Sequence, residues 1–329
     1  MYRFAKRGLV LMLVLSLLAT MMIGCQQEPA EQDEGQQQAE TVFINIGTGG
    51  TAGTYYPLGG AMAEILKANI PGVNATAEST GASSANINML NQGEIELALV
   101  QNDVSYYADL GIELFEEQGK IEGLRAIATL YPEVCQIITT KNTGITSVAD
   151  FAGKKIAVGA AGSGVEANAR QILAAYGLSY EDIKPQYLSF AEAAAGLKDG
   201  NIDAGFITAG TPTSAVLDLS AQNQVVLISI DDAIADQLVE EYPFYTKVLI
   251  PADVYNTDAD IQTLAVKAML ATTDKMSEEM AYNITKAIFE NLDKLAAAHT
   301  AGKSVSLETA QEGISIPLHP GAEKYFNEL

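Results

Sequence analysis

Histidine and cysteine are scarce in this 329-residue sequence, which contains two of each. The histidines, His299 and His319, lie twenty residues apart, whereas zinc sites need several histidine or cysteine ligands at short spacings. The sequence therefore predicts no metal site, and nothing in it indicates a cofactor. Cys135 lies in the apolar run VCQII, where we expect a buried and chemically inert thiol.

Basic residues are also few, since 19 lysines and arginines are set against 41 aspartates and glutamates. Three of the 19 lie in the first seven residues, so loss of that segment would leave 16 basic residues and a net charge of −25. Nucleic-acid binding depends on lysine and arginine at phosphates, so this balance argues against a nucleic-acid partner. It favours solubility outside the cell, and it requires local groups to attract any anionic ligand.

The chain begins with a segment typical of a signal peptide. Basic residues precede the apolar stretch Leu9–Met22, which is too short and too one-sided to be interpreted first as a membrane helix. Residues 22–25, MIGC, resemble a bacterial lipoprotein cleavage site, with Met22 where leucine is usual. This resemblance implies a signal peptide over residues 1–24 and a lipid on the thiol of Cys25. An ordinary signal peptide with an incidental cysteine is the alternative.

The segment that follows Cys25 has a different composition. It contains no aromatic and no branched aliphatic residue, so it cannot bury a core. We predict that residues 25–40 form a disordered, lipid-anchored tether to a folded body that begins near Thr41.

The apolar pattern of the folded body alternates between strand and helix. The first series comprises strand-like runs at 42–46, 73–77, 97–100 and 126–130 and helical patterns at 58–69 and 83–92. After a polar turn, the second series comprises strand-like runs at 155–159, 187–190, 204–208 and 225–230 and helical patterns at 166–176 and 191–198. Apolar strands separated by helices are typical of a parallel α/β sheet.

The C-terminal part of the chain contains too few strands for a third domain. Residues 264–271 fit either a strand or a short helix, and residues 278–295 predict a helix with Ser277 as its N-cap. The economical interpretation is that this part returns to the first domain. We therefore predict an α/β protein of two lobes joined by two crossing segments, with a ligand cleft between the lobes. The predicted lobe 1 comprises residues 41–140 and 248–329, and lobe 2 comprises residues 141–247.

The turn at residues 47–59, GTGGTAGTYYPLG, is rich in glycine and threonine and connects a predicted strand to a predicted helix. Gly47, Gly49 and Ala52 fit the dinucleotide pattern G-x-G-x-x-G/A, but the acidic residue expected about 20 residues later is missing. Pro57 also delays the helix. A site for a small organic anion at the helix start is the favoured interpretation. A tight turn whose threonines bind its own backbone is the alternative.

Similar loops follow other predicted strands, at 78–84, 100–103, 159–170 and 206–216. In the third loop Ser163 and Glu166 have the spacing of a capping box. Arg170 is placed for an ion pair with Glu166, and a contact of Arg170 with the ligand is the alternative. Each lobe thus offers a helix start rich in glycine, serine and threonine. Two such starts that face each other across a cleft could enclose a carboxylate.

Several segments resemble the TAXI solute receptors of TRAP transporters. They are IGTGGTAGTYYPLGGAMAEIL (46–66), NMLNQGEIELALVQNDVSYYA (88–108), LYPEVCQIITT (130–140), SVADFAGKKIAVGAAGSGVEANARQILAAYGL (147–178), YLSFAEAAAGLKDGNIDAGFITAGTPTSAV (187–216) and IPLHPGAEKYF (316–326). The resemblance implies a two-lobed fold like that of type II periplasmic binding proteins, with lobes that close on the ligand by a hinge. It also implies capture of glutamate, glutamine or a C5 dicarboxylate such as 2-oxoglutarate, and delivery to a TRAP membrane permease driven by an ion gradient.

The same resemblance implies a set of ligand-binding residues. They are Thr48, Thr51, Tyr55, Tyr56, Ser79, Gln101, Ser163, Gly164 and Thr208. His319, in the C-terminal HPGA motif, is expected to be structural. No arginine clamp of the kind found in the other TRAP receptor family is evident. We expect a monomer outside the cytoplasm, at the cell surface or in the periplasm, held to the membrane by its lipid.

Two alternatives belong to other functional classes. Ser163 stands between glycines, but Ala161 and Val165 break the G-x-S-x-G frame of a hydrolase, and both histidines lie in the C-terminal part. We therefore expect no enzymatic activity. A lipoprotein that presents the same solute to a signalling partner would share the fold and the site.

Overall fold

The computed structural model describes residues 41–222 and 225–329. The predicted signal peptide, Cys25 and the tether lie outside the described residues. Among the helices of the described ranges, none combines the length and the apolar character that crossing a bilayer requires.

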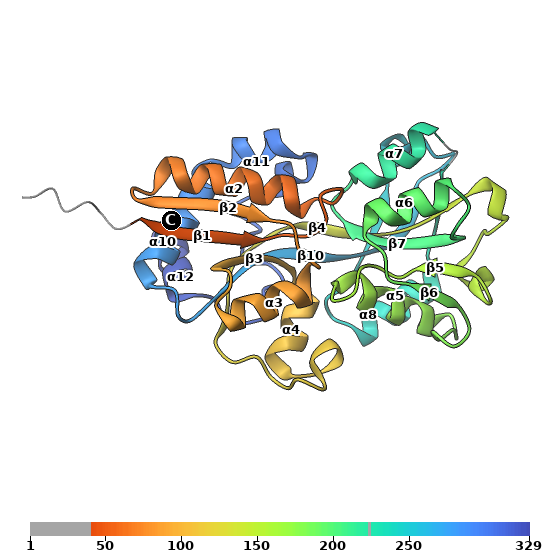
Figure 1. Cartoon of the computed structure of the whole chain (residues 1–329), viewed down its shortest axis with the longest axis horizontal. Helices are drawn as coiled ribbons and strands as arrows, with labels where there is room; N and C mark the ends of the chain where they lie inside the picture. Colours follow the sequence, from red (N-terminus) through yellow and green to blue (C-terminus); the bar gives the residue numbers. More distant parts are fainter. Residues whose placement is uncertain (1–40, 223–224) are drawn as a thin grey trace, which may run out of the picture. The chain divides into compact units, whose positions relative to one another are not determined.

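The first group of elements surrounds three parallel strands, β1 (Val42–Gly47), β2 (Val73–Glu78) and β3 (Leu97–Gln101). β1 lies between the other two strands. The helices of this group are α2 (Tyr55–Asn69), α3 (Ser83–Gln92) and α4 (Asn102–Leu110), joined by the C-terminal helices α10 (Glu278–Phe289), α11 (Leu292–Ala298) and α12 (Pro320–Asn327). In Figure 1 they occupy the left-hand part of the body.

The second group occupies the right-hand part of the body in Figure 1. Its strands are β5 (Lys155–Ala157), β6 (Lys184–Gln186), β7 (Ala204–Ala209), β8 (Val225–Ile228) and β9 (Thr246–Ile250). Its helices are α5 (Gly164–Ala175), α6 (Phe190–Lys198), α7 (Ser214–Gln222), α8 (Asp232–Glu241) and α9 (Ala252–Tyr255). Short 3-10 helices lie at Glu113–Phe115, Lys141–Thr143, Val148–Phe151 and Thr300–Ser304.

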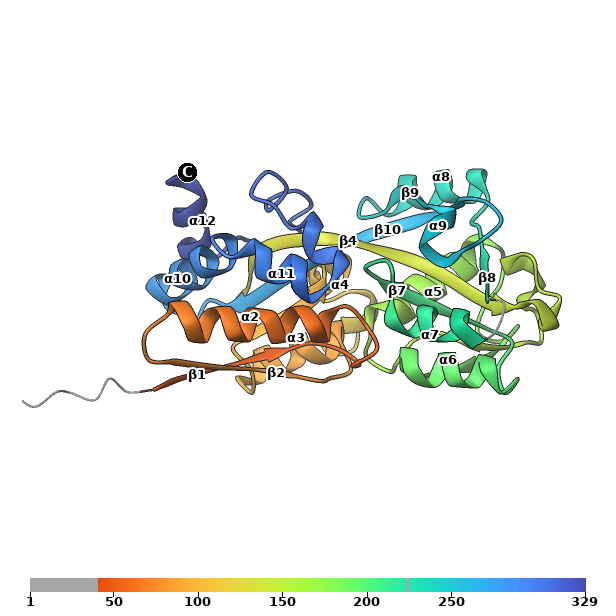
Figure 2. The ribbon, with the colours of Figure 1, turned by 90° about the horizontal axis from the view of Figure 1, so that it is seen from above.

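Two long strands run through both groups, as Figure 2 shows. They are β4 (Leu124–Thr140) and β10 (Ile261–Thr273), and they pair with each other in antiparallel orientation. The strand order of the sheet is β2-β1-β3-β10-β4-β7-β5-β6, with β8 beside β4 and β9 beside β10. β10 is antiparallel to β3 and β4 is antiparallel to β7, so the prediction of an all-parallel sheet is wrong at its centre. The two crossing segments are therefore strands of the sheet itself.

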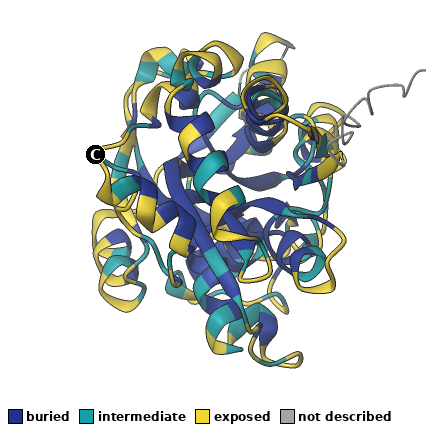
Figure 3. Cartoon of the chain, turned by 90° about the vertical axis from the view of Figure 1, so that its left-hand side faces the viewer, coloured by how far each residue is buried: buried dark blue, intermediate teal, exposed yellow. Residues whose placement is uncertain are grey.

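The sheet separates hydrophobic clusters on its two faces. Leu97 and Leu99 of β3 pack in the cluster that contains α2 and α10, whereas Ala98 and Val100 pack with α3 and α4. This alternation follows from the two-residue period of a strand. Figure 3 shows the buried strands inside helices whose outer faces are exposed.

The division of the body into lobes at residues 140 and 247 stays a prediction. Ile250 of β9 and Leu264 and Val266 of β10 pack in the clusters that contain residues of β7. Ala268 and Leu270 of β10 pack instead with α2. This packing favours a second crossing inside β10 rather than before β9.

Most predicted elements are present, and two are wrong. The strand predicted at 187–190 is absent, because β6 ends at Gln186 and Ser189 caps α6 through a capping box with Glu192. The helix predicted at 278–295 is two helices, because α10 ends at Phe289 and α11 begins at Leu292. Ser277 does cap α10, since its hydroxyl accepts a hydrogen bond from the Met280 amide. The ambiguous segment 264–271 is part of β10.

Candidate ligand-binding site

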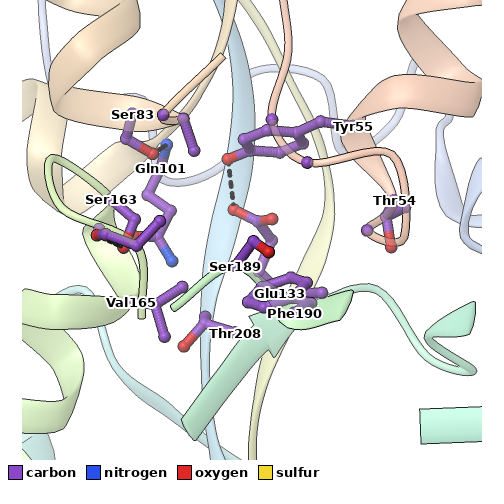
Figure 4. Close-up of a pocket in the computed structure, with 18 of the residues that line it drawn as sticks. Thr54, Tyr55, Ser83, Gln101, Glu133, Ser163, Val165, Ser189, Phe190 and Thr208 are labelled. Atoms are coloured by element: carbon purple, nitrogen blue, oxygen red, sulfur yellow. Dashed lines mark hydrogen bonds between the residues drawn. The ribbon is translucent and has the colours of Figure 1, made fainter. Parts of the chain in front are cut away.

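A cavity lies where loops and helix starts of the two groups meet, and Figure 4 shows it in close-up. Its empty volume, the open mouth included, is about 600 Å³. Its lining residues are Gly49, Gly50, Gly53, Thr54, Tyr55, Thr80, Gly81, Ala82, Ser83, Gln101, Glu133, Ala160, Ser163, Gly164, Val165, Ser189, Phe190, Thr208 and Ala209. The two groups also contact each other beside it, since the Ser84 amide donates to the Gly162 carbonyl and the Thr54 hydroxyl donates to the Gly210 carbonyl.

Four helices begin at the cavity. They are α2, α3, α5 and α6, whose first residues Tyr55, Ser83, Gly164 and Phe190 all line it. The first amides of a helix lack intrahelical acceptors, and the helix dipole places partial positive charge there. None of the lining residues is a lysine, arginine or histidine. Among the described lining residues, local attraction for an anion would therefore come from the backbone amides at the helix starts.

Three of these four helix starts have no side-chain cap. Thr54, Ala82 and Ser163 occupy the N-cap positions of α2, α3 and α5 without a capping hydrogen bond. The predicted capping box of Ser163 and Glu166 is wrong, because the Ser163 hydroxyl donates to the Ala160 carbonyl at 2.7 Å. Glu166 instead accepts from the Tyr180 hydroxyl at 2.7 Å. The start of α5 thus keeps its amides available to a ligand.

Glu133 is the one carboxylate among the lining residues, and it projects from β4 with only 2% of its surface exposed. One of its oxygens accepts a hydrogen bond from the Tyr55 hydroxyl at 2.7 Å, drawn as the dashed line between these residues in Figure 4. Burial raises the pKa of Glu133 from 4.5 to about 8, partly offset by this hydrogen bond and reinforced by the charge of Asp103. In the empty protein at neutral pH this side chain is therefore mostly uncharged.

Behind Gln101 lies a buried polar network that connects the two groups. The Gln101 amide donates to the Asn168 side-chain oxygen at 3.1 Å, and the Asn168 amide donates to Asp103 and to the Tyr245 hydroxyl, both at 2.9 Å. Burial raises the pKa of Asp103 to about 6. Within the described residues, the Gln101 Oε1 and one oxygen of Asp103 have no hydrogen-bond partner.

Gln101 also explains why residue 164 is a glycine. A Cβ atom at Gly164 would lie 1.5 Å from the Gln101 Oε1 and 2.7 Å from a methyl group of Val104. Only a residue without a side chain lets α5 approach Gln101 this closely.

Comparisons with known proteins agree with this architecture. A family model described as the NMT1-like family matches residues 46–329.

The chain belongs to the NMT1-like family.

Among solved structures, a protein of Bordetella bronchiseptica is similar with a TM-score of 0.51 and 18% identity, over 87% of this chain and 82% of that one. The alkanesulfonate-binding protein of Xanthomonas axonopodis pv. citri has a TM-score of 0.48 and 18% identity, over 88% and 84% of the two chains. The periplasmic aliphatic sulphonate binding protein of Escherichia coli has a TM-score of 0.48 and 18% identity, over 87% and 78%. The predicted α/β class and two-lobed, periplasmic-binding-protein-like fold are confirmed.

The NMT1-like chain brings five of the nine predicted ligand-binding residues into the cavity. These five are Tyr55, Gln101, Ser163, Gly164 and Thr208. They come from α2, β3, the start of α5 and β7, so both groups contribute. Their role toward a ligand stays a prediction.

The other four predicted residues do not line the cavity. Thr48 is buried and its hydroxyl donates to the Glu78 carbonyl at 2.5 Å, while the Ser79 hydroxyl donates to the Gly49 carbonyl at 3.0 Å. These two side chains stabilise the glycine-rich turn through its backbone. For Thr48 this agrees with the alternative interpretation, in which the threonines of the turn bind backbone groups instead of a ligand. Thr51 is exposed, and Tyr56 is 38% exposed.

Sequence reasoning missed Glu133, Ser83 and Phe190 as lining residues. The signal for Glu133 was an acidic residue inside the otherwise apolar run LYPEVCQII, which becomes β4. Phe190 was missed because its segment was predicted to be a strand.

Three other expectations concern residues away from the lining. Cys135 is buried, as predicted, and burial raises the pKa of its thiol to about 12, which favours the predicted inert role. His319 caps α12 through the Gly321 amide and contacts the Met276 carbonyl, which is the expected structural role. Arg170 pairs with Glu166 at 3.5 Å, as predicted, and with Glu113 at 2.8 Å.

Proposed function

We propose that this chain is an extracytoplasmic solute receptor of the TAXI type. In this proposal it captures a small organic anion or amino acid, namely glutamate, glutamine or a C5 dicarboxylate such as 2-oxoglutarate. It then delivers the solute to a TRAP membrane permease. The observation that carries the proposal is the convergence of four helix starts, three of them without a side-chain cap, on one cavity between two groups of elements.

The energetics are compatible with anion capture by a very acidic protein. A hydrogen bond to a charged group contributes roughly 1.5–3 kcal/mol, so a carboxylate bound by several backbone amides gains enough to outweigh a diffuse repulsion. Exposed charges are screened over roughly 8–10 Å in physiological salt. The starts of α2 and α5 are the groups that would bind the carboxylate, because the Ser84 and Ala85 amides at the start of α3 already donate to the Gly162 carbonyl. Closure of the two lobes would bury the carboxylate.

The permease, the anchor and the location rest on the sequence. The segments that resemble TAXI receptors support a TRAP permease as partner. The signal segment and the lipoprotein-like residues around Cys25 support a lipid anchor at the cell surface or in the periplasm. A receptor needs no catalytic groups, and the Ser163 hydroxyl is engaged by the Ala160 carbonyl rather than by a base. Presentation of the solute to a signalling partner is the alternative that would use the same cavity.

Calorimetric titration of the purified chain from residue 26 onward tests the proposal. We expect saturable binding with one site per chain for at least one compound among glutamate, glutamine, 2-oxoglutarate and glutarate. Absence of binding for all four would refute the ligand class. For the partner, reconstituted vesicles that contain the TRAP permease should accumulate the bound compound only when the receptor and an ion gradient are both present.

A further inference from the structure

The position of Glu133, an acidic residue, in the lining is not explained if the cavity binds only the negatively charged groups of a ligand. It projects into the lining between Tyr55 and Phe190 (Figure 4), and it is almost fully buried. A ligand carboxylate beside it would meet a second carboxyl group. That arrangement repels unless one of the two groups is protonated or a positive charge lies between them.

The described residues that line the cavity do not supply this positive charge. The lining residues include no lysine, arginine or histidine, and the Tyr55 hydroxyl is the one side-chain donor bonded to Glu133 within the described chain. That hydroxyl binds Oε2, so Oε1 is left for another donor. A cation at this place would therefore have to come with the ligand.

A second acceptor points to the same kind of group. The Gln101 side chain lines the cavity, and its Oε1 is buried against Gly164 with no hydrogen-bond partner among the described residues. An ammonium group has three N–H donors and no acceptor, so it needs several acceptors around it. Glu133 and Gln101 offer two side-chain acceptors at this cavity.

We infer that Glu133 is the residue that sets the specificity of the cavity, because its carboxylate binds the ammonium group of a zwitterionic ligand whose carboxylate lies at the helix starts. The cavity then selects amino acids over the 2-oxo acids and dicarboxylic acids of the same shape. This inference rests on the proposed receptor function and narrows its ligand class.

Binding should also displace a proton. Four titratable groups interact electrostatically with Glu133, and none of them is a cation. They are Tyr55 of α2, Asp103 of α4, and Tyr131 and Cys135 of β4. With its raised pKa, Glu133 holds a proton at neutral pH in the empty protein and gives it up when an ammonium group arrives. A 2-oxo acid has no positive charge to replace that proton and leaves Glu133 protonated.

Matched ligand pairs test the inference by calorimetry at pH 7. The pairs are L-glutamate and 2-oxoglutarate, L-alanine and pyruvate, and L-leucine and 4-methyl-2-oxopentanoate. The amino acid of the pair that binds should bind at least tenfold more tightly than its 2-oxo partner. Repeating the titration in buffers of different ionisation enthalpy should reveal proton release with the amino acid and none with the 2-oxo acid.

Two isosteric variants complete the test. Glu133→Gln should lose at least tenfold in affinity for the amino acid, together with the preference within the pair and the proton release. Glu94→Gln, the same substitution at an exposed glutamate that is not among the lining residues, should keep the affinity, the preference and the proton release, and it controls for the substitution itself. A 2-oxo acid that binds wild-type protein as tightly as its amino acid, or a preference that survives in Glu133→Gln, would overturn the inference and leave the receptor function intact. No binding by any member of the pairs, and none by glutamine or glutarate, would refute both the inference and the proposed ligand class.

Discussion

Replacement of the buried carboxyl group in the cavity should make the empty protein more stable. Glu133 has a pKa of about 8 when folded, against an ordinary value of 4.5. An acid whose pKa is raised by folding holds its proton in the folded state while the unfolded chain has already lost it. The contribution of Glu133 to the free energy of unfolding is therefore most favourable below pH 4.5, and it decreases as the pH rises toward 8.

The size of the effect follows from the shift. Each pKa unit corresponds to about 1.4 kcal/mol, so the raised pKa of Glu133 lowers the free energy of unfolding by about 3 kcal/mol at pH 7 and by about 5 kcal/mol above pH 8. Glu133→Gln cannot ionise and keeps an oxygen that can accept from Tyr55. We expect Glu133→Gln and wild type to be equally stable near pH 4, and the variant to be more stable by about 3 kcal/mol at pH 7. That difference should raise Tm by roughly 5 °C or more.

Urea unfolding at several pH values between 4 and 8.5 measures this difference directly. Subtraction of the two curves removes the contributions of all other acidic groups, which both proteins share. Glu94→Gln, at an exposed glutamate, is the control and should show no pH-dependent difference from wild type. A Glu133→Gln variant that is less stable than wild type at pH 7, or a difference that does not grow with pH, would refute the claim that burial keeps this acid uncharged.

Three further predictions follow from contacts in and near the cavity. Gly164→Ala should abolish ligand binding and destabilise the fold by at least about 2 kcal/mol in urea unfolding, because its Cβ would lie 1.5 Å from the Gln101 Oε1. Gly60→Ala in α2 is the control, since a Cβ there has nothing within 4 Å, and it should stabilise the fold by about 0.5–1 kcal/mol. Tyr55→Phe should cost about 1–3 kcal/mol of stability at pH 8.5 and less at pH 5. The reason is that the Tyr55 hydroxyl binds the Glu133 carboxyl group most strongly when that group is charged. Equal losses of stability at the two pH values would contradict this. Ser163→Ala should weaken ligand binding severalfold in calorimetry with a change in Tm of only a few degrees, and unchanged affinity would move the ligand away from the start of α5.

The order of strands and helices could be predicted from the sequence to a large extent, because it depends on local periodicity. The helix at 83–92 has the predicted bounds, and β1, β2, β3 and β7 each differ from prediction by one residue. The direction of the central strands could not be predicted in this way. An apolar run has the same pattern whether its neighbour is parallel or antiparallel, so the antiparallel pairing of β4 and β10 becomes visible only in the fold.

The candidate site was predictable where backbone chemistry defines it. Glycine-rich segments before helices indicated the starts of α2 and α5, and both line the cavity. Side-chain direction was not predictable, which is why Thr48 and Ser79 turned out to hold the turn that contains Gly49. Glu133 was missed although an acidic residue in an apolar run is a signal, because the sequence does not show which other segments that side chain faces.

The most direct test of the account is a crystal structure of the chain bound to the tightest ligand found in the paired titrations. The account predicts the ligand inside the cavity, with its carboxylate within hydrogen-bond distance of backbone amides at the start of α5 and of at least one helix start from the other group. A ligand bound elsewhere on the protein, or a carboxylate that makes no contact with these amides, would contradict it.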